Sequence, residues 1–260
     1  MHLKETISLT GTSGFVGKHL VASLQKSYDV QSINWRTTSI PPITGVACVH
    51  LAGIAKDTTS ISPETYRAIN YEKMVALYDQ FLQTTHCQKF IFISSSKVAT
   101  NATTPYVVSK QMAEAYITHK VLPEQKFFYI IRPSILYGKD CKNKLKYLAW
   151  WGKLGLPWVF DNPRYAVLYV ENLCWLIQYI IEHDLPSGIY TVADEPNIHL
   201  ADFVLAWRKK PLSWLQRLTK NVHLSLGIKA QLVDTKPLYQ HIAQPLPFTT
   251  FQAIAHLRNS

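Results

Sequence analysis

The stretch that decides the fold is LTGTSGFVGKHL, which runs from Leu9 to Leu20. Its three glycines, Gly11, Gly14 and Gly17, follow the pattern G-x-x-G-x-x-G. A β-rich run over residues 6–11 precedes the turn, and apolar residues at helical spacing follow it. A glycine turn between a strand and a helix lets the backbone approach a phosphate. The helix then directs its N-terminal N–H groups and positive dipole end toward the same point. The stretch therefore predicts a phosphate-binding turn at the start of an α/β domain.

The apolar pattern beyond this turn alternates between strands and helices. Strand-like runs span residues 28–35, 45–53, 89–96, 126–134 and 188–194, and helical spacing spans residues 64–82, 106–120, 143–152 and 171–183. Such alternation builds βαβ units and hence a parallel sheet with helices on both faces. We predict an α/β fold in which residues 1–138 form a Rossmann-like, doubly wound nucleotide-binding domain. Residues 139–260 are expected to form a smaller substrate-binding lobe, partly interleaved with the first domain.

The composition narrows the class of partner. The 260 residues include 27 Lys or Arg and 17 Asp or Glu, which gives a formal net charge of +10. A basic surface suits phosphorylated ligands, nucleic acid or an anionic membrane, but no nucleic-acid motif accompanies the charge, so we expect no nucleic-acid partner. No apolar run reaches the ~18 residues of a transmembrane segment, and the glycines come too early for a secretory signal. The protein is therefore expected in the cytoplasm. Its scattered cysteines and histidines predict no metal site.

The end of the second predicted strand bears on the cofactor. A dinucleotide site usually places an acid about twenty residues after the glycines, where it holds the ribose 2′-hydroxyl. Here residues 32–36 read SINWR, with Asn34 in the place of the acid and Arg36 close behind. A neutral side chain removes charge repulsion, and arginine offers a forked cation to a 2′-phosphate. The sequence therefore favours NADP(H) over NAD(H).

A tyrosine and a lysine stand four residues apart in TPYVVSK, at Tyr106 and Lys110. This spacing places both on one face of a helix. A phenol is a poor acid–base group at neutral pH, and a nearby ammonium favours its ionised form. Residues 94–96 are serines at the carboxyl end of a buried strand, the edge of a parallel sheet where ligands bind. A serine hydroxyl and the Tyr106 phenol could then share one substrate oxygen.

The motifs occur in a characteristic order along the chain. They are TGTSGFVG (10–17), HLAG (50–53), AIN (68–70), FISSS (92–96), PYVVSK (105–110), RPSILYG (132–138) and YVENL (169–173). Their combination resembles the extended short-chain dehydrogenase/reductase superfamily, in its nucleotide-sugar epimerase, dehydratase and reductase branch. The resemblance extends over residues 6 to about 195. The segment LPFTTFQAI (246–254) also resembles the closing segment of bacterial surface-polysaccharide members.

The resemblance implies roles for particular residues. Tyr106 is the acid–base residue, and Lys110 lowers its pKa and holds the nicotinamide ribose. Counting back from Val98 gives Ser95 as the catalytic serine, with Ser96 as the alternative. The implied cofactor contacts are Gly11, Ser13, Gly14, Phe15, Val16, Gly17, Asn34, Arg36, Leu51, Ala52, Gly53, Asn70, Tyr106, Lys110 and Pro133. The implied substrate contacts are Lys56, Ser95, Ser96 and Arg164, although Arg164 stands one residue too far from YVENL.

The chain departs from the family pattern at two points. The tyrosine that usually follows Val98 is Ala99, which removes a packing group near the site. Only about ten residues separate the second predicted strand from VACVHLAG, so the usual third-strand unit is trimmed or absent.

Three reactions on a nucleotide-linked hexose are open to this branch of the superfamily. A 4,6-dehydratase carries an Asp–Glu pair directly after the serine, but this chain has Lys97 and no acid there. Asn34 and Arg36 favour a reductase that uses NADPH over a 4-epimerase that retains NAD. We therefore predict an NADP-dependent reductase of a nucleotide-diphosphate-linked 4-keto-6-deoxy-hexose or hexosamine, acting in surface polysaccharide synthesis. The alternatives are an NAD-dependent nucleotide-sugar 4-epimerase and a non-catalytic NADP(H)-sensing protein. Residues 64–82 and 106–120 are the expected contacts of a homodimer.

Overall fold

The computed structural model describes residues 4–35, 37, 39–100, 102–208 and 232–259. Its centre is a six-stranded sheet in the order β2-β1-β3-β4-β5-β9, in which every neighbouring pair is parallel. The strands are β1 (Thr6–Thr10), β2 (Asp29–Ile33), β3 (Ala47–His50), β4 (Lys89–Ile93), β5 (Phe127–Pro133) and β9 (Gly188–Val192). The predicted Rossmann-like α/β fold is confirmed.

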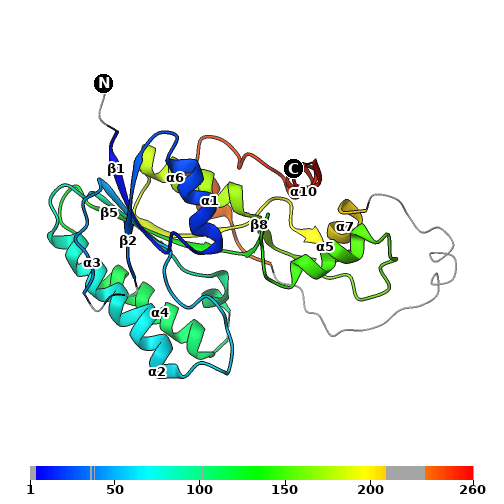
Figure 1. Cartoon of the computed structure of the whole chain (residues 1–260), viewed down its shortest axis with the longest axis horizontal. Helices are drawn as coiled ribbons and strands as arrows, with labels where there is room; N and C mark the ends of the chain where they lie inside the picture. The colour runs from blue at the N-terminus through cyan, green and yellow to red at the C-terminus, as the bar shows by residue number, and fades with distance from the viewer. Residues whose placement is uncertain (1–3, 36, 38, 101, 209–231, 260) are drawn as a thin grey trace.

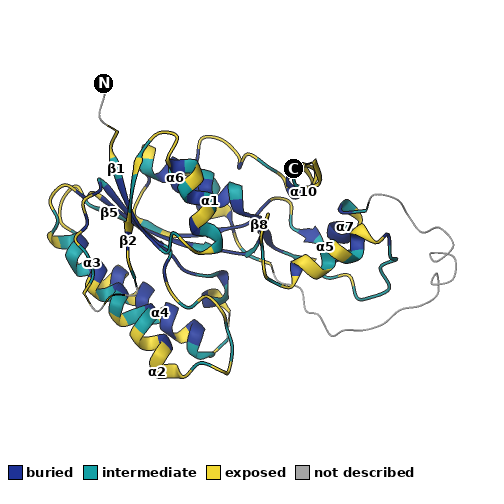
Figure 2. Cartoon of the chain, in the orientation of Figure 1, coloured by how far each residue is buried: buried dark blue, intermediate teal, exposed yellow. Residues whose placement is uncertain are grey.

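Helices cover both faces of the sheet (Figure 1). One face carries α1 (Phe15–Leu24) and α6 (Val170–Glu182), which pack on each other. The other carries α2 (Pro63–Tyr66), the π-helix η1 (Arg67–Glu72), α3 (Lys73–Gln83) and α4 (Pro105–His119). Successive strand residues point to opposite faces of the sheet, and both faces are apolar. In β4, Ile91 belongs to the core under α1 and α6, whereas Phe90 and Phe92 belong to the core under α3 and α4. The near-continuous apolar runs in the sequence reflect this burial on both sides, seen as dark strands in Figure 2.

The other described residues form small paired strands and short helices beside the carboxyl end of the sheet. The pairs are β6 (Ile135–Tyr137) with β8 (Val167–Tyr169), and β7 (Arg164–Tyr165) with β10 (Ile198–His199). The helices are α5 (Leu145–Lys153), α7 (Leu200–Ala206), α9 (Lys236–Tyr239) and α10 (Thr250–Asn259). Both β9 and α6 come from beyond residue 138 yet belong to the central layers. The division into two domains at that residue stays a prediction.

A buried carboxylate ties β6 and β8 to the end of β9. Asp194 accepts hydrogen bonds from the Tyr137 hydroxyl at 2.7 Å, from the backbone N–H of Tyr169 at 3.1 Å and from the Asn172 amide at 2.7 Å. Burial raises the pKa of Asp194 to about 6, although each of these hydrogen bonds favours the ionised form. Three donors from separate elements thus converge on one side chain and fix how the smaller elements sit on the sheet.

The sheet ends at β2, because no described strand pairs with its outer side. Among the described residues of 34–46, which connect β2 to β3, there is neither helix nor strand. The connection is anchored by Trp35, whose ring lies 4.4 Å from that of His50, and whose carbonyl accepts a hydrogen bond from Lys73. Within the described part of the chain, no helix is long and apolar enough to cross a membrane.

Candidate active site

The glycine turn between β1 and α1 leaves no room for side chains at two of its positions. Gly11 has a φ of +75°, and a Cβ there would lie 2.8 Å from the backbone nitrogen of Ala52. A Cβ at Gly17 would lie 2.1 Å from the carbonyl oxygen of Gly11. Helix α1 begins with Gly14 as its N-cap, with no side-chain cap and no acidic residue in its first turn. The first-turn N–H groups are therefore suited to a phosphate ligand.

The loop after β3 is locked to the glycine turn by a threonine. The Thr10 hydroxyl is hydrogen-bonded to Nδ1 of His50 at 2.7 Å and accepts from the backbone N–H groups of Leu51 and Ala52, each at 3.1 Å. The motif HLAG therefore places Leu51 and Ala52 against the turn. Sequence reasoning missed Thr10, since its partners stand some forty residues away in the chain.

A cavity of about 220 Å³ lies where these loops meet the ends of β4 and β5. Seven of the residues predicted from the sequence line it, namely Val16, Leu51, Gly53, Ser95, Tyr106, Lys110 and Pro133. Ser94 and Ser134 line it too; they are 5% and 6% exposed, and their hydroxyls have no hydrogen-bond partner among the described residues. Buried hydroxyls without partners are costly, so a polar ligand group in this cavity would satisfy them. The cavity fits the amide-bearing ring of a nicotinamide.

Tyr106 and Ser95 meet at this cavity because two capped elements start beside it. Ser95 is the N-cap of the 3₁₀-helix η2 (Ser96–Ala99), and Thr104 caps α4, whose first turn has Pro105 and Tyr106. Tyr106 is only 6% exposed. Burial raises the pKa of Tyr106, and a hydrogen bond with Ser95 lowers it in part. Ser96, the alternative serine, is buried and lines a different cavity of about 460 Å³.

Lys110 lies one helical turn beyond Tyr106 and is buried. Its ammonium donates to the carbonyl of Ile93 at 2.9 Å and lies 4.5 Å from the centre of the Phe92 ring. Burial lowers the pKa of Lys110 to about 8, while the Glu114 carboxylate acts in the opposite direction. The sequence led us to expect that Lys110 lowers the pKa of Tyr106. In this structure burial gives that pKa a net rise, and the effect of Lys110 on it stays a prediction.

Two polar residues near the site, Asn70 and Arg132, connect the elements around it. Asn70, in the π-helix, accepts from the backbone N–H of Ile54 at 2.7 Å and donates to the Ser109 hydroxyl at 3.1 Å. It therefore holds the loop after Gly53 against α4, and its position in a π-helical turn is one often found at functional sites. Arg132 donates to the buried Glu114 carboxylate at 3.0 Å. This pairing gives Arg132 a structural role on β5.

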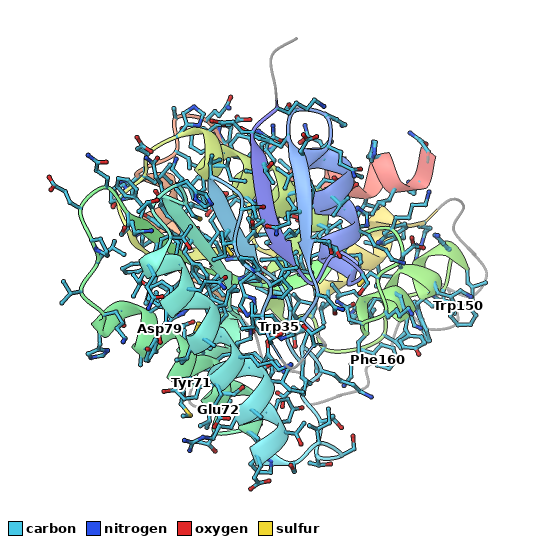
Figure 3. The ribbon with its side chains drawn as sticks, turned by 60° about the vertical axis from the view of Figure 1, so that its left-hand side comes forward. Trp35, Tyr71, Glu72, Asp79, Trp150 and Phe160 are labelled. Atoms are coloured by element: carbon cyan, nitrogen blue, oxygen red, sulfur yellow. The ribbon has the colours of Figure 1, made fainter. Side chains whose placement is uncertain are left out.

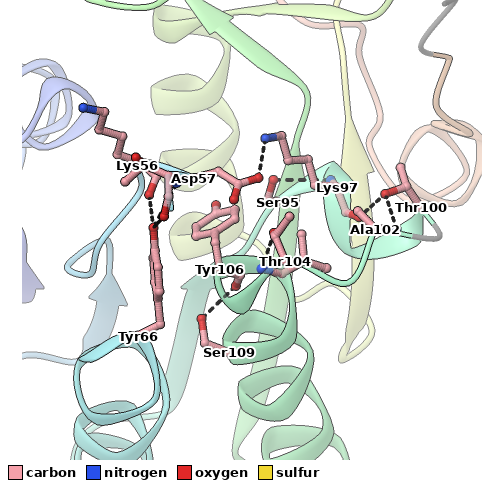
Figure 4. A network of polar contacts seen from close by, with 12 residues as sticks. Lys56, Asp57, Tyr66, Ser95, Lys97, Thr100, Ala102, Thr104, Tyr106 and Ser109 are labelled. Carbon is pink, nitrogen blue, oxygen red and sulfur yellow. Dashed lines mark hydrogen bonds and ion pairs between the residues drawn. The ribbon is translucent and has the colours of Figure 1, made fainter. Parts of the chain in front are cut away.

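Sequence reasoning missed an ion pair across the mouth of the site. The Lys97 ammonium and the Asp57 carboxylate are 2.9 Å apart. Figure 4 shows the Asp57 carboxylate beside the hydroxyls of Tyr106 and Ser95. The negative charge of Asp57 contributes to the raised pKa of Tyr106. Lys97 stands in the place of the dehydratase acids, but no local pattern indicates its partner, which lies on the loop after β3.

Three further predicted residues, Lys56, Arg164 and Asn34, do not line the cavity. Lys56 is exposed, and its carbonyl accepts a hydrogen bond from Tyr66. Arg164 is exposed on β7 and donates to the His199 ring at 3.2 Å. Asn34 is exposed after β2, and its carbonyl accepts from the Thr37 hydroxyl at 2.9 Å. Arg36 lies outside the described residues, so its role stays a prediction.

Comparisons with known proteins agree with this architecture. No family model matches the chain. A UDP-glucose 4-epimerase from Vibrio cholerae is 27% identical over 246 residues, which cover 78% of this chain and 74% of that protein. The dTDP-4-dehydrorhamnose reductase of Bacillus anthracis, solved with NADP, has a TM-score of 0.71 at 18% identity, covering 99% of this chain and 98% of the reductase. The Bordetella bronchiseptica enzyme WbmG, solved with NAD and UDP, has a TM-score of 0.73 at 12% identity, covering 98% of this chain and 93% of WbmG.

Proposed function

We propose that this protein is an NADP-dependent 4-ketoreductase. The proposal starts from its similarity to NAD(P)-dependent nucleotide-sugar epimerases and reductases of the extended short-chain dehydrogenase/reductase superfamily. Its substrate is a nucleotide-diphosphate-linked 4-keto-6-deoxy-hexose or hexosamine. The reaction takes place in the cytoplasm and serves surface polysaccharide synthesis. The enzyme acts as a homodimer through the helices within residues 64–82 and 106–120.

The observation that carries the proposal is the position of Tyr106. It is buried at the cavity and is hydrogen-bonded with Ser95. A phenol in this place can give its proton to a substrate oxygen that also contacts Ser95, as a ketoreductase requires. An epimerase would use the same pair, so the preference for a reductase rests on Asn34 and Arg36, which favour NADPH.

The residues present fit a nicotinamide dinucleotide. The uncapped start of α1 and the glycine turn would hold the pyrophosphate. Ser94 and Ser134 would satisfy the nicotinamide amide with their unpaired hydroxyls. Asn34 and Arg36 would bind the 2′-phosphate that distinguishes NADP from NAD. When bound, NADPH would supply the hydride for the sugar C4.

Residues of the chain then carry out the proton transfer. Tyr106 donates its phenolic proton to the O4 oxygen as negative charge develops there, and Ser95 donates a hydrogen bond to the same oxygen. The Lys110 ammonium stabilises the phenolate that remains and holds the nicotinamide ribose. Below about pH 8 this ammonium keeps its charge. Lys56 and Arg164 would contact the substrate diphosphate and align C4 for transfer.

A 4-epimerase is the second candidate, and the Vibrio cholerae relative is the observation that favours it. Such an enzyme oxidises C4 and reduces it again with one retained NAD. A non-catalytic NADP(H)-sensing protein is less well supported. Ser95, Tyr106 and Lys110 line a single cavity, an arrangement that a mere binding protein does not need.

One experiment separates the three functions. The purified protein is assayed for NADPH oxidation with UDP-4-keto-6-deoxy-hexosamine, for interconversion of UDP-glucose and UDP-galactose, and for nucleotide retained through purification. A reductase oxidises NADPH and retains no NAD. Tyr106→Phe should lower kcat by about a thousandfold, since proton transfer contributes 10²–10⁴-fold in such reactions. Tyr116→Phe, on the same helix but bonded to Asp79 at 2.7 Å, is the matched control and should keep wild-type activity. Equal rates for Tyr106→Phe and wild type would disprove the mechanism.

A further inference from the structure

Exposed apolar side chains gather at the end of the molecule formed by α5 and α7, which pack on each other. Tyr147 and Trp150 are 61% and 59% exposed, and Leu154 and Leu205 are 44% and 45% exposed. Tyr147 and Trp150 are three residues apart on one face of α5, and Leu154, the C-cap of the helix, follows four residues later. Figure 3 shows Trp150 at the outer edge of the molecule. We refer to these four side chains as the aromatic end.

An apolar groove of about 710 Å³ adjoins the aromatic end. Its lining includes Trp150 and Ala149 of α5, Trp207 after α7, and Leu257 of α10. The groove is separate from the candidate active site, because the two lie on opposite sides of β6. Leu136 lines the active-site cavity, whereas its neighbour Tyr137 lines the groove. The cofactor and substrate residues described above therefore do not account for it.

Positive charge surrounds this apolar surface. Residues 139–155 contain five lysines, all exposed, at 139, 142, 144, 146 and 153, and one acid, Asp140. Within the described part of the chain none of these lysines forms an ion pair with a carboxylate. Lys146 instead lies 4.8 Å from the centre of the Tyr147 ring, and Lys153 lies 5.0 Å from that of Trp207. The lysines thus surround the aromatic side chains, and no carboxylate of the described residues forms an ion pair with them.

We propose that the aromatic end docks on an anionic lipid bilayer. Tryptophan and tyrosine prefer the boundary between headgroups and acyl chains, where an apolar ring and a polar tip are both accommodated. Lysines around them attract anionic headgroups, and their apolar stems extend over the same surface. An amphipathic helix of this composition lies in the plane of the interface. The charge of α5 and its flanks is complementary to such a surface.

The test is co-sedimentation of the full chain with lipid vesicles. Vesicles of phosphatidylcholine mixed with phosphatidylglycerol should bind the protein, added NaCl should weaken the binding, and pure phosphatidylcholine should bind it poorly. Trp150→Ala and the double substitution Lys146→Gln/Lys153→Gln should each weaken binding by about tenfold. Lys120→Gln/Val121→Ala changes an exposed lysine and an exposed apolar residue after α4, and this matched control should bind as wild type does.

Circular dichroism and thermal unfolding show whether each variant is folded. The proposal is overturned if the folded wild type stays in the supernatant with anionic vesicles, or if the control loses as much binding as Trp150→Ala. It is also overturned if vesicles fail to bind while Trp150→Ala changes the oligomeric state in solution, since the occupant would then be a second copy of the chain. None of these outcomes depends on the reductase proposal, because vesicle binding is measured without substrate.

Discussion

The carboxyl edge of the sheet is built differently at its two ends. Around β1 the chain is fixed by close contacts, since Gly11 and Gly17 have no room for a Cβ and Thr10 holds the next loop by two backbone N–H groups. Beyond β2 the sheet has no further described strand, and the connection is held by Trp35. The β1 end is thus closely packed, whereas the β2 end is reduced to a short connection. If the protein binds NADPH as proposed, most of the affinity must come from the first end.

The largest effect is expected from Gly17→Ala, which disrupts the close contacts of the glycine turn at the packed end. The added methyl group would lie 2.1 Å from the Gly11 carbonyl oxygen, so the turn must move away from α1. A forced shift in such a contact costs up to about 3 kcal/mol, which is roughly a hundredfold in NADPH affinity. Fluorescence titration with NADPH measures the loss.

Gly188→Ala is the matched control for this substitution. Its added Cβ would meet only Tyr190 side-chain atoms at 3.9 Å, an ordinary contact. Its NADPH affinity should equal that of wild type. If Gly17→Ala bound NADPH as tightly as the control, the close packing of the turn would have no role in cofactor binding.

The opposite end is tested by Trp35→Ala. Removing the ring uncovers His50 and the apolar residues of the α3/α4 core, which should lower the free energy of unfolding by about 2 kcal/mol. NADPH affinity should change less than in Gly17→Ala, because the ring supports the connection and not the phosphate turn. Urea unfolding and NADPH titration on the same samples give both quantities. If the free energy of NADPH binding fell by more than the free energy of unfolding, Trp35 would be shown to contact the cofactor itself.

The same contrast explains what could be predicted from the sequence. The parallel sheet, the glycine turn and the spacing of Tyr106 and Lys110 are local patterns, and they were recognisable in the residues themselves. The pair of Lys97 and Asp57 depends on two loops meeting in space, and no local pattern indicates it. The π-helix at Arg67–Glu72 was predicted as ordinary helix, because one irregular spacing within residues 64–82 is too little to reveal it. The strands β7 and β10 have two residues each, too few to show any period.

Cofactor choice at the reduced end is tested by Arg36→Ala. A charged hydrogen bond to the 2′-phosphate is worth about 1.5–3 kcal/mol, so NADPH should bind at least tenfold more weakly. NADH has no 2′-phosphate and should bind as before. Parallel titrations with the two nucleotides decide the matter. An equal loss for both would remove the case for NADP.

The smallest effect is expected from the ion pair over the active site, and it appears in the pH profile. Lys97→Met leaves the Asp57 charge unpaired beside Tyr106, which disfavours the phenolate and raises the pKa of Tyr106 further. Asp57→Asn removes the charge and lowers that pKa. Because the reductase uses the protonated phenol, its loss of activity at high pH should move up by about half a unit in Lys97→Met and down by a similar amount in Asp57→Asn.

The double variant Lys97→Met/Asp57→Asn should fall between the two single variants, since the charge that Lys97 neutralises is then absent. Lys26→Met, an exposed lysine after α1 and far from the site, should leave the profile unchanged. Lys110, with a pKa of about 8, titrates below the raised pKa of Tyr106, so it gives a lower step that is common to all the proteins, and the shift is measured in the higher step. A profile that moves in the same direction in both single variants would mean that the pair positions the loops and that its charge does not act on Tyr106. The packed end would then control the tyrosine through geometry alone.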